Sequence, residues 1–229
     1  MHRSPSESTS RRSFLSWTGA AGAGLVLAAC QADTSSTLTA PVAPGLKKGG
    51  NSPQAGSGIV TVDGPTVGLP LSSDTDILKF ALFLELLEAE FYKLAVASNL
   101  LDGLVLEIST DVRDHEICHV DFLRAALGGA ATGNSITFDF SRTLRNERQY
   151  LNAAVSFEQT GVGAYLGALP LISDKNLRSV AGTIFTIEAR HTAAFRALNH
   201  RTPAPVAFET PLTPQQVVSA ISPFVVEGL

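Results

Sequence analysis

Four long stretches of helical periodicity, separated by two very short turns and one longer linker, constrain the fold of this chain most strongly. Apolar residues recur at steps of three and four over residues 74–100, 103–127, 141–169 and 174–199, which places them on one face of each helix. The turns near residues 101 and 171 are short enough to join antiparallel neighbours. A helix of 26 residues is about 39 Å long. The linker, residues 128–140, reaches about 43 Å when extended, so it can return along the full length of such a helix.

These lengths predict an all-α four-helix bundle in which two antiparallel hairpins are joined by one long crossover. Residues 213–221, "TPQQVVSAI", predict a short C-terminal helix. Thr213 would cap it, Pro214 would occupy its first turn and Gln216 would close a capping box. Residues 58–70 predict a short strand or an extended arm packed on the bundle, and the bundle with its C-terminal extension would cover residues 74–229.

Each predicted inner face has an acidic residue within an otherwise mostly apolar stripe. The first and third helices each have a Glu followed seven residues later by a Tyr, whereas the second and fourth each have a Glu-x-x-His pair: Glu85/Tyr92, Glu158/Tyr165, Glu116/His119 and Glu188/His191. The separation between the two Glu residues of a hairpin is 31 in the first half and 30 in the second. Counted from the turn at residue 101, Glu85 lies 16 residues before it and Glu116 lies 15 after it, and counted from the turn at residue 171, Glu158 lies 13 before it and Glu188 lies 17 after it. Within each hairpin the acidic residues are therefore expected at nearly the same depth.

Four carboxylates and two imidazoles would thus meet in an apolar interior. Burying even one unpaired carboxylate costs several kcal/mol, and two divalent cations would balance the four negative charges. A pair of Glu residues with two Glu-x-x-His pairs is the donor set of di-iron and di-manganese carboxylate bundles. Oxygen and imidazole ligands suit iron or manganese.

On these residues, and on "LELLEAEFY" (84–92), the segment 74–199 resembles a ferritin-like domain of the exported, desiccation-related type. The resemblance implies two iron ions, or alternatively two manganese ions, as cofactors. It implies Tyr92 and Tyr165 as neighbours of the metal ligands, and no catalytic residue beyond the metal site. The ligands that it implies are Glu85, Glu116, His119, Glu158, Glu188 and His191.

Several readings of single residues stay open at this point. Glu88 also faces inward, and it is either an additional ligand, a proton relay or neither. The Glu-x-x-His pairs have two plainer explanations, a pair on the solvent face or a metal-free core cluster, and the tyrosines could be ordinary core residues. His115 and His200 are expected to be exposed.

The N-terminal segment predicts export. "SRRSFL" (10–15) resembles a twin-arginine signal, and the apolar run after it ends in "LAAC" (27–30), which resembles a lipoprotein box. Residues 1–30 would be the signal, Cys30 the lipidated residue, and residues 31–73 a Ser/Thr/Pro/Gly-rich tether with the extended arm. The protein would then be periplasmic or on the cell surface, anchored to a membrane by lipid.

The remaining charge argues against nucleic acid as a partner. Loss of Arg3, Arg11, Arg12 and Glu7 with the signal would change the net charge from −4 to −6, and an acidic chain without a basic patch is not typical of nucleic-acid binding.

The function expected from the residues and the resemblance is iron binding and oxidation with oxygen or peroxide, by a monomer or small oligomer. As an enzyme, the protein would be an oxidoreductase of the ferroxidase or peroxide-consuming type. The alternatives are a di-manganese catalase-like enzyme and a non-enzymatic envelope protein that protects against stress or desiccation.

Overall fold

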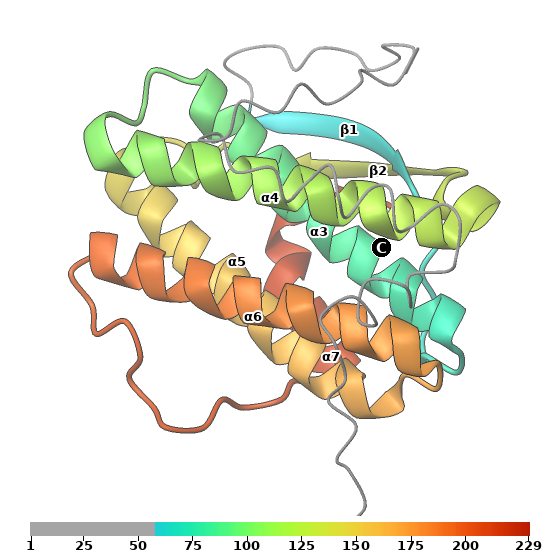
Figure 1. Ribbon diagram of the computed structural model, residues 1–229. Helices are drawn as coiled ribbons and strands as arrows, with labels where there is room; N and C mark the ends of the chain where they lie inside the picture. The colour runs from blue at the N-terminus through green and yellow to red at the C-terminus, as the bar shows by residue number, and fades with distance from the viewer. Residues whose placement is uncertain (1–57) are drawn as a thin grey trace, which may run out of the picture.

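The computed structural model describes residues 58–229, and its centre is a bundle of four long helices (Figure 1). The predicted signal, Cys30 and residues 31–57 of the predicted tether lie outside the described residues. In the part of the chain that is described, no helix has both the length and the apolar character that crossing a membrane requires. The four helices are α3 (Asp74–Ala97), α4 (Gly103–Leu127), α5 (Glu147–Ala168) and α6 (Lys175–Leu198).

The predicted connectivity is confirmed. Helices α3 and α4 pack side by side as one hairpin, and α5 and α6 form the other, with the short 3-10 turn Leu169–Leu171 between them. The chain passes from one hairpin to the other between Leu127 and Glu147. Each long helix therefore presents one face to the opposite hairpin.

Capping side chains account for three of the helix starts. The side chains of Ser73, Asn146 and Asp174 accept hydrogen bonds from backbone N–H groups in the first turns of α3, α5 and α6, which satisfies donors that have no partner within the helix. At the start of α6, the carboxylate of Asp174 accepts from the N–H groups of Asn176 and Leu177.

Two predicted helix boundaries are wrong by several residues. The third helix begins at Glu147 rather than at 141, because residues 141–146 form turns in which Thr143 and Leu144 donate to the Phe140 carbonyl. The first helix ends at Ala97 rather than at 100. Its last carbonyls are capped there by Ser98, whose N–H bonds Leu94 and Ala95.

The crossover contains a strand that the sequence analysis missed. Strand β2 (Asn134–Asp139) is the middle of a three-stranded antiparallel sheet, with β1 (Ile59–Gly64) on one side and β3 (Val225–Glu227) on the other. Of the two alternatives for residues 58–70, a short strand or an extended arm, the structure shows a strand, β1. Ile136 and Phe138 alternate inward along β2 and are fully buried, so the crossover contributes to the core as well as connecting the hairpins.

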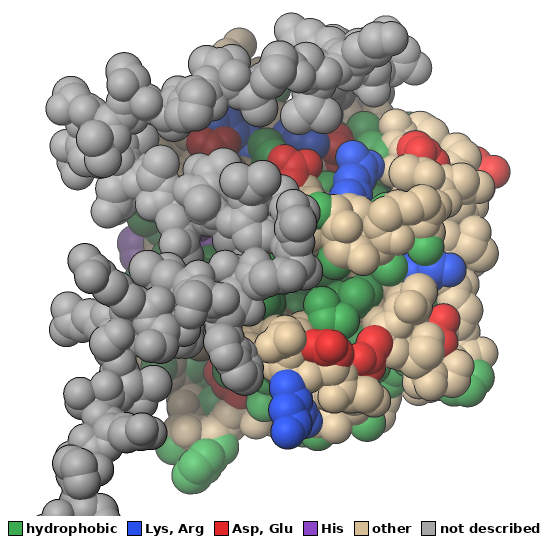
Figure 2. All heavy atoms as spheres, turned by 45° about the vertical axis from the view of Figure 1, so that its right-hand side comes forward, with side chains coloured by type: hydrophobic (Ala, Val, Ile, Leu, Met, Phe, Trp, Pro, Cys, Tyr) green, Lys and Arg blue, Asp and Glu red, His purple; other side chains and the backbone are tan. Residues whose placement is uncertain are grey.

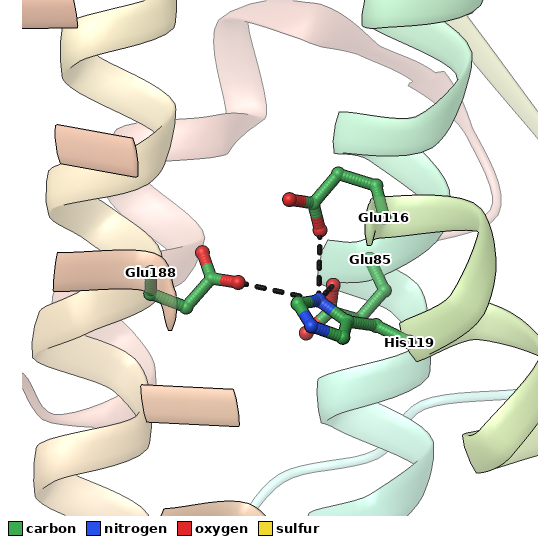
Figure 3. A group of neighbouring side chains, drawn as sticks. All are labelled: Glu85, Glu116, His119 and Glu188. Atoms are coloured by element: carbon green, nitrogen blue, oxygen red, sulfur yellow. Dashed lines mark hydrogen bonds and ion pairs between the residues drawn. The ribbon is translucent and has the colours of Figure 1, made fainter. Parts of the chain in front are cut away.

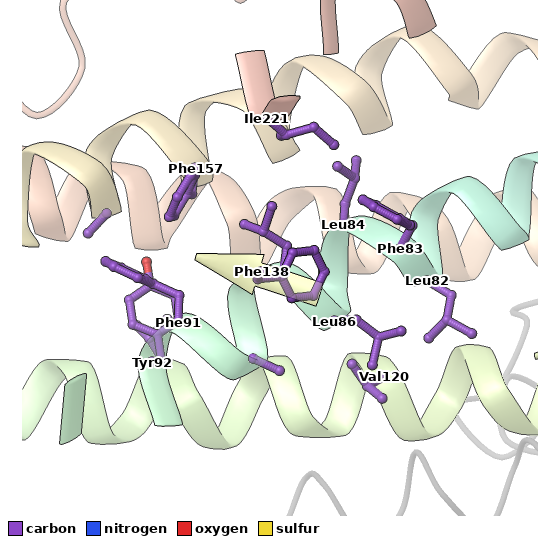
Figure 4. Packing of buried hydrophobic residues seen from close by; sticks show 14 of the residues in the cluster. Leu82, Phe83, Leu84, Leu86, Phe91, Tyr92, Val120, Phe138, Phe157 and Ile221 are labelled. Carbon is purple, nitrogen blue, oxygen red and sulfur yellow. The ribbon is translucent and has the colours of Figure 1, made fainter. Parts of the chain in front are cut away.

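An aromatic cluster joins the sheet to the bundle (Figure 4). Phe138 packs edge-on against Phe83 of α3, with ring centroids 5.7 Å apart. Phe91 of α3 contacts Phe140 and Phe157 in the same manner. The predicted C-terminal helix is confirmed as α7 (Pro214–Ile221), with its capping box between Thr213 and Gln216. These elements fix α3 and α5, and thereby the depth at which their acidic residues lie.

Candidate metal centre

The six predicted ligands come from all four long helices and meet inside the bundle. Glu85 lies on α3, Glu158 on α5, and the two Glu-x-x-His pairs on α4 and α6. All four carboxylates are fully buried. The two imidazoles are nearly so, with side-chain exposures of 11% for His119 and 5% for His191. The plainer explanation, an exposed pair on a helix surface, therefore does not apply.

The six side chains form two overlapping groups of four. In each group, one ligand atom from every residue lies within 4.8 Å of the others. One group is Glu85, Glu116, His119 and Glu188 (Figure 3), and the other is Glu116, Glu158, Glu188 and His191. Glu116 and Glu188 belong to both groups. Each group thus has one carboxylate and one imidazole of its own, and the two groups share a pair of carboxylates.

The carboxylates have fewer protein donors than they need. Nδ1 of His119 lies 3.2 Å from Glu85, 3.1 Å from Glu116 and 3.3 Å from Glu188, although one N–H can bond well to only one acceptor. Glu188 Oε2 is buried without a hydrogen-bond partner. Because buried polar atoms in native proteins are almost always paired, this deficit fits a site completed by cations.

The pKa values in the metal-free protein reflect the same crowding. Burial raises the pKa of Glu85 to about 7, with the charge of Glu116 adding to the rise. Burial and the neighbouring carboxylates raise the pKa of Glu188 well above its usual range. Burial acts on Glu116 in the same direction, but His119 and His191 outweigh it and hold its pKa well below 4.5. Without cations, Glu85 and Glu188 therefore hold their protons to higher pH than a free Glu side chain does.

Protonation of the two histidines completes this balance. Burial alone would lower their pKa values, but the carboxylates around them raise the pKa of both well above 6.5. For His119 these are mainly Glu85 and Glu116, and for His191 mainly Glu158 and Glu116. In the metal-free protein, His119 and His191 thus favour their charged forms and supply positive charge that metal ions would otherwise bring to the cluster.

Tyr92 and Tyr165 are neighbours of the cluster, as the resemblance implied. Tyr92 of α3 donates its hydroxyl to Glu158 of α5 at 2.5 Å. In the reciprocal arrangement, Tyr165 of α5 donates to Glu85 of α3. Each tyrosine thus crosses between the hairpins and fixes the carboxylate that belongs to one group alone. This exchange agrees with the matching spacing of the motifs in the two halves of the chain.

Glu88 lies beside the cluster as a fifth buried carboxyl group. Its pKa is raised well above the usual range by burial and by Glu188, Glu158, Glu116 and Glu85. Gly161 of α5 faces it. A Cβ atom on Gly161 would lie 3.4 Å from Glu88 Oε1 and 2.9 Å from Glu188 Oε2. The absence of a side chain at residue 161 therefore makes room for both carboxyl groups, while Glu88 belongs to neither group of four.

His115 has a contact that its sequence position does not show. Its side chain is exposed, as expected, but its Nδ1 lies 2.9 Å from Nε2 of His191. The sequence shows only that His115 and His119 are four residues apart and share a face of α4. His200 is exposed, as expected.

An apolar cavity lies about one helical turn from the cluster, at the end of the bundle where α3 begins. Leu78, Ala81 and Ile184 are among its lining residues, and so is Tyr165, the residue that donates to Glu85. Its volume of about 30 Å³ has room for about one water-sized molecule. Figure 2 shows hydrophobic side chains in a hollow between charged residues on this side of the molecule. Apolar walls favour a small uncharged molecule over an ion.

Comparison with known proteins agrees with this geometry. The family profile described as the ferritin-like domain matches residues 73–201, which include all four long helices and every residue of both groups. A search of curated proteins gives no match.

Proposed function

The chain belongs to the ferritin-like domain family, and from its buried Glu/His cluster we propose that it is a di-metal carboxylate protein that oxidises iron with oxygen or peroxide. The observation that supports this most directly is the sharing of Glu116 and Glu188 between two groups of donors. Four carboxylate charges would be balanced by two divalent cations, and hard oxygen and imidazole donors fit iron.

The proposed roles of the residues follow from the two groups. Glu85 and His119 would bind one metal ion, Glu158 and His191 the other, and Glu116 and Glu188 would bridge the two. The chemistry that two ferrous ions would supply at this site is the transfer of one electron from each ion to a single molecule of oxidant. The tyrosines would keep Glu85 and Glu158 turned toward the metals, and the surrounding apolar side chains would limit the access of water.

Manganese is the second candidate, because the same donors suit it. A di-manganese centre would make peroxide disproportionation the reaction to test. Glu88 enters the proposal as an additional ligand or a proton relay, since it is the only carboxyl group of the described residues that is buried beside the cluster without belonging to either group of four.

Elemental analysis of the protein purified from its native exported compartment tests this proposal. About two iron ions per chain would support the di-iron assignment, and stopped-flow oxidation by oxygen and by peroxide would then identify the oxidant. About two manganese ions would support the catalase-like alternative. If the protein contains no metal and takes up none from anaerobic Fe(II), the proposal fails and the protective-protein alternative becomes the leading one.

A matched pair of variants on α4 separates metal binding from a general effect on the helix. Glu116→Gln removes a shared carboxylate, whereas Glu107→Gln removes an exposed one from the same helix. Glu116→Gln should lose bound metal and the stabilisation that metal binding provides. Glu107→Gln should retain both, and equal metal contents in the two variants would contradict the assignment of Glu116.

We further propose that the protein is exported in folded form and anchored by lipid at Cys30. The support is the sequence alone, in "SRRSFL" and "LAAC". Labelling of cells with a radioactive fatty acid tests it directly. The wild-type protein should be labelled and should sediment with membranes, whereas Cys30→Ala should be unlabelled and released.

A further inference from the structure

His115 lies at the outer edge of the metal centre and is bonded to one of its ligands. It lies on α4, one turn before His119, and its Nδ1 is 2.9 Å from Nε2 of His191 on α6. The two rings are within 8° of parallel, with their centroids 5.2 Å apart. With the ring planes nearly parallel, the N–H of one imidazole can point at the lone pair of the other within the plane of the rings.

The two nitrogens of His191 therefore face different partners. Nδ1 faces the cluster, at 3.0 Å from Glu116 and 3.1 Å from Glu158, so it is the nitrogen available to a metal ion. Nε2 faces away, toward His115. A histidine that binds metal through one nitrogen usually donates its other N–H to an acceptor, and this bond fixes its tautomer and its ring orientation.

Among the described residues, the other half of the site has no such partner. The residue before Glu116 is His115, but the residue before Glu188 is Ile187, whose side chain cannot accept a hydrogen bond. Within residues 58–229, every hydrogen bond and ion pair of the His119 ring involves Nδ1. The two groups of donors otherwise match closely, and the hydrogen bond between His115 and His191 is the difference between them.

We propose that His115 is a positioning residue that orients His191, and that it makes the metal position beside His191 bind more tightly than the position beside His119. This inference rests on the proposed di-metal function. His115 itself does not bind the metal in this scheme. It accepts the N–H of His191 and holds Nδ1 of that ring toward Glu116 and Glu158.

Anaerobic titration of the metal-free protein with Fe(II), at one fixed pH, tests the inference. The wild-type protein should bind two ions in two steps of unequal affinity. His115→Leu keeps the bulk of the side chain and removes the acceptor, so the tighter step should weaken by about 10- to 100-fold while the other step changes little. His115→Gln offers an amide oxygen as acceptor and should recover most of the loss. His200→Leu removes an exposed histidine elsewhere and should match the wild type.

Two further readouts distinguish positioning from a general loss of structure. Mössbauer spectra of the loaded protein should show two different iron sites in the wild type, with only one of them altered in His115→Leu. Imidazole ¹⁵N spectra of the metal-free protein should show a change at Nε2 of His191 in the same variant. The second measurement needs no metal, so it reports on the hydrogen bond by itself.

The outcomes separate this inference from the function on which it rests. If the wild-type protein binds no Fe(II), the proposed function fails, and this inference with it. If the wild type binds two ions and His115→Leu binds them with unchanged affinities, only the role of His115 is refuted. Equal weakening of both steps would also refute it, because a positioning bond to His191 should act on one position.

Discussion

Substitution of Gly161 by alanine should stabilise helix α5 and at the same time weaken metal binding. Gly161 lies inside α5, where glycine costs about 1 kcal/mol relative to alanine. Its missing side chain leaves space for the carboxyl groups of Glu188 and Glu88. The same methyl group therefore has a favourable effect on the backbone of α5 and an unfavourable one on a shared ligand.

The distances indicate how large each effect should be. The new Cβ would lie 2.9 Å from Glu188 Oε2, so this oxygen must move by roughly 0.5 Å or more to reach ordinary van der Waals separation. Oε2 is at the end of a flexible side chain, so this movement costs little in the metal-free protein. In the loaded protein it would displace a carboxylate that we propose as a bridging ligand. We expect the affinity for the metal pair to fall by at least about 10-fold, in the range seen when partners of metal ligands are disturbed.

Chemical and thermal unfolding with and without metal would measure both effects. In chelator, Gly161→Ala should be as stable as the wild type or up to about 1 kcal/mol more stable, which is about 2–4 °C in Tm for a chain of this size. With Fe(II) under anaerobic conditions, it should gain less stability than the wild type. Gly182→Ala is the matched control, because Gly182 lies in α6 with open space where its Cβ would be.

The opposite pattern would refute this reasoning. Gly182→Ala should gain stability both with and without metal, and it should bind two ions normally. If Gly161→Ala also bound two ions with wild-type affinity, Glu188 would not be a bridging ligand in the position described. A loss of several kcal/mol in chelator would show instead that the space beside Gly161 is needed for folding.

Three other perturbations test separate parts of the structure. The metal-free protein should lose stability as the pH rises from about 4.5 to 7, because the pKa of Glu85 is raised to about 7 and the folded state holds this proton more tightly than the unfolded state. At about 1.4 kcal/mol per pH unit, the loss is about 3 kcal/mol. Urea unfolding in chelator measures it, and greater stability at pH 8 than at pH 5 would contradict the prediction. Tyr92→Phe should weaken metal binding in an anaerobic Fe(II) titration, because Glu158 loses its hydrogen-bond donor. Tyr150→Phe is the control: it loses a hydrogen bond to Ser109 and should reduce stability without changing the amount of metal bound. Phe138→Ala should destabilise the protein by about 3–5 kcal/mol, measured by urea unfolding, because Phe138 is fully buried in β2; a loss below 1 kcal/mol would show that the crossover is not part of the core.

The helices and the position of the cluster were predictable because they depend on local periodicity. Helix α4 was predicted with its observed bounds, since Asp102 and Gly128 mark its ends and its apolar residues repeat at three and four. The meeting of Glu85, Glu116, Glu158 and Glu188 followed from their similar distances to the hairpin turns, 13 to 17 residues. Once loop lengths fix the hairpins, the depth of a residue is a matter of counting.

The sheet was harder to predict because it depends on contacts between distant parts of the chain. In residues 134–140, every second residue is a large apolar one: Ile136, Phe138 and Phe140. This period of two is typical of a strand, but the linker was interpreted only by its length. Strand β3 has three residues, too few to give any periodic signal. Its existence depends on pairing with β2.

The contact of His115 with His191 was also beyond reach of single-helix reasoning. His115 lies one turn before His119 on α4, but which residue of α6 it meets depends on how far apart the two helices lie. Glu88 shows the same limit. Its inward direction was evident from α3, whereas the space that Gly161 provides on α5 becomes visible only in the folded structure.

The three-stranded sheet has a consequence for the speed of folding. A bundle of helical hairpins would normally form from contacts close in sequence and fold quickly. Here Ile59 pairs with Asp139 and Thr137 pairs with Glu227, separations of 139 − 59 = 80 and 227 − 137 = 90 residues. Such distant pairings raise the contact order and slow folding. During synthesis, β2 can pair with β1 early, but its second edge stays open until residues 225–227 leave the ribosome, so the native fold is completed only after nearly all of the described chain has been made.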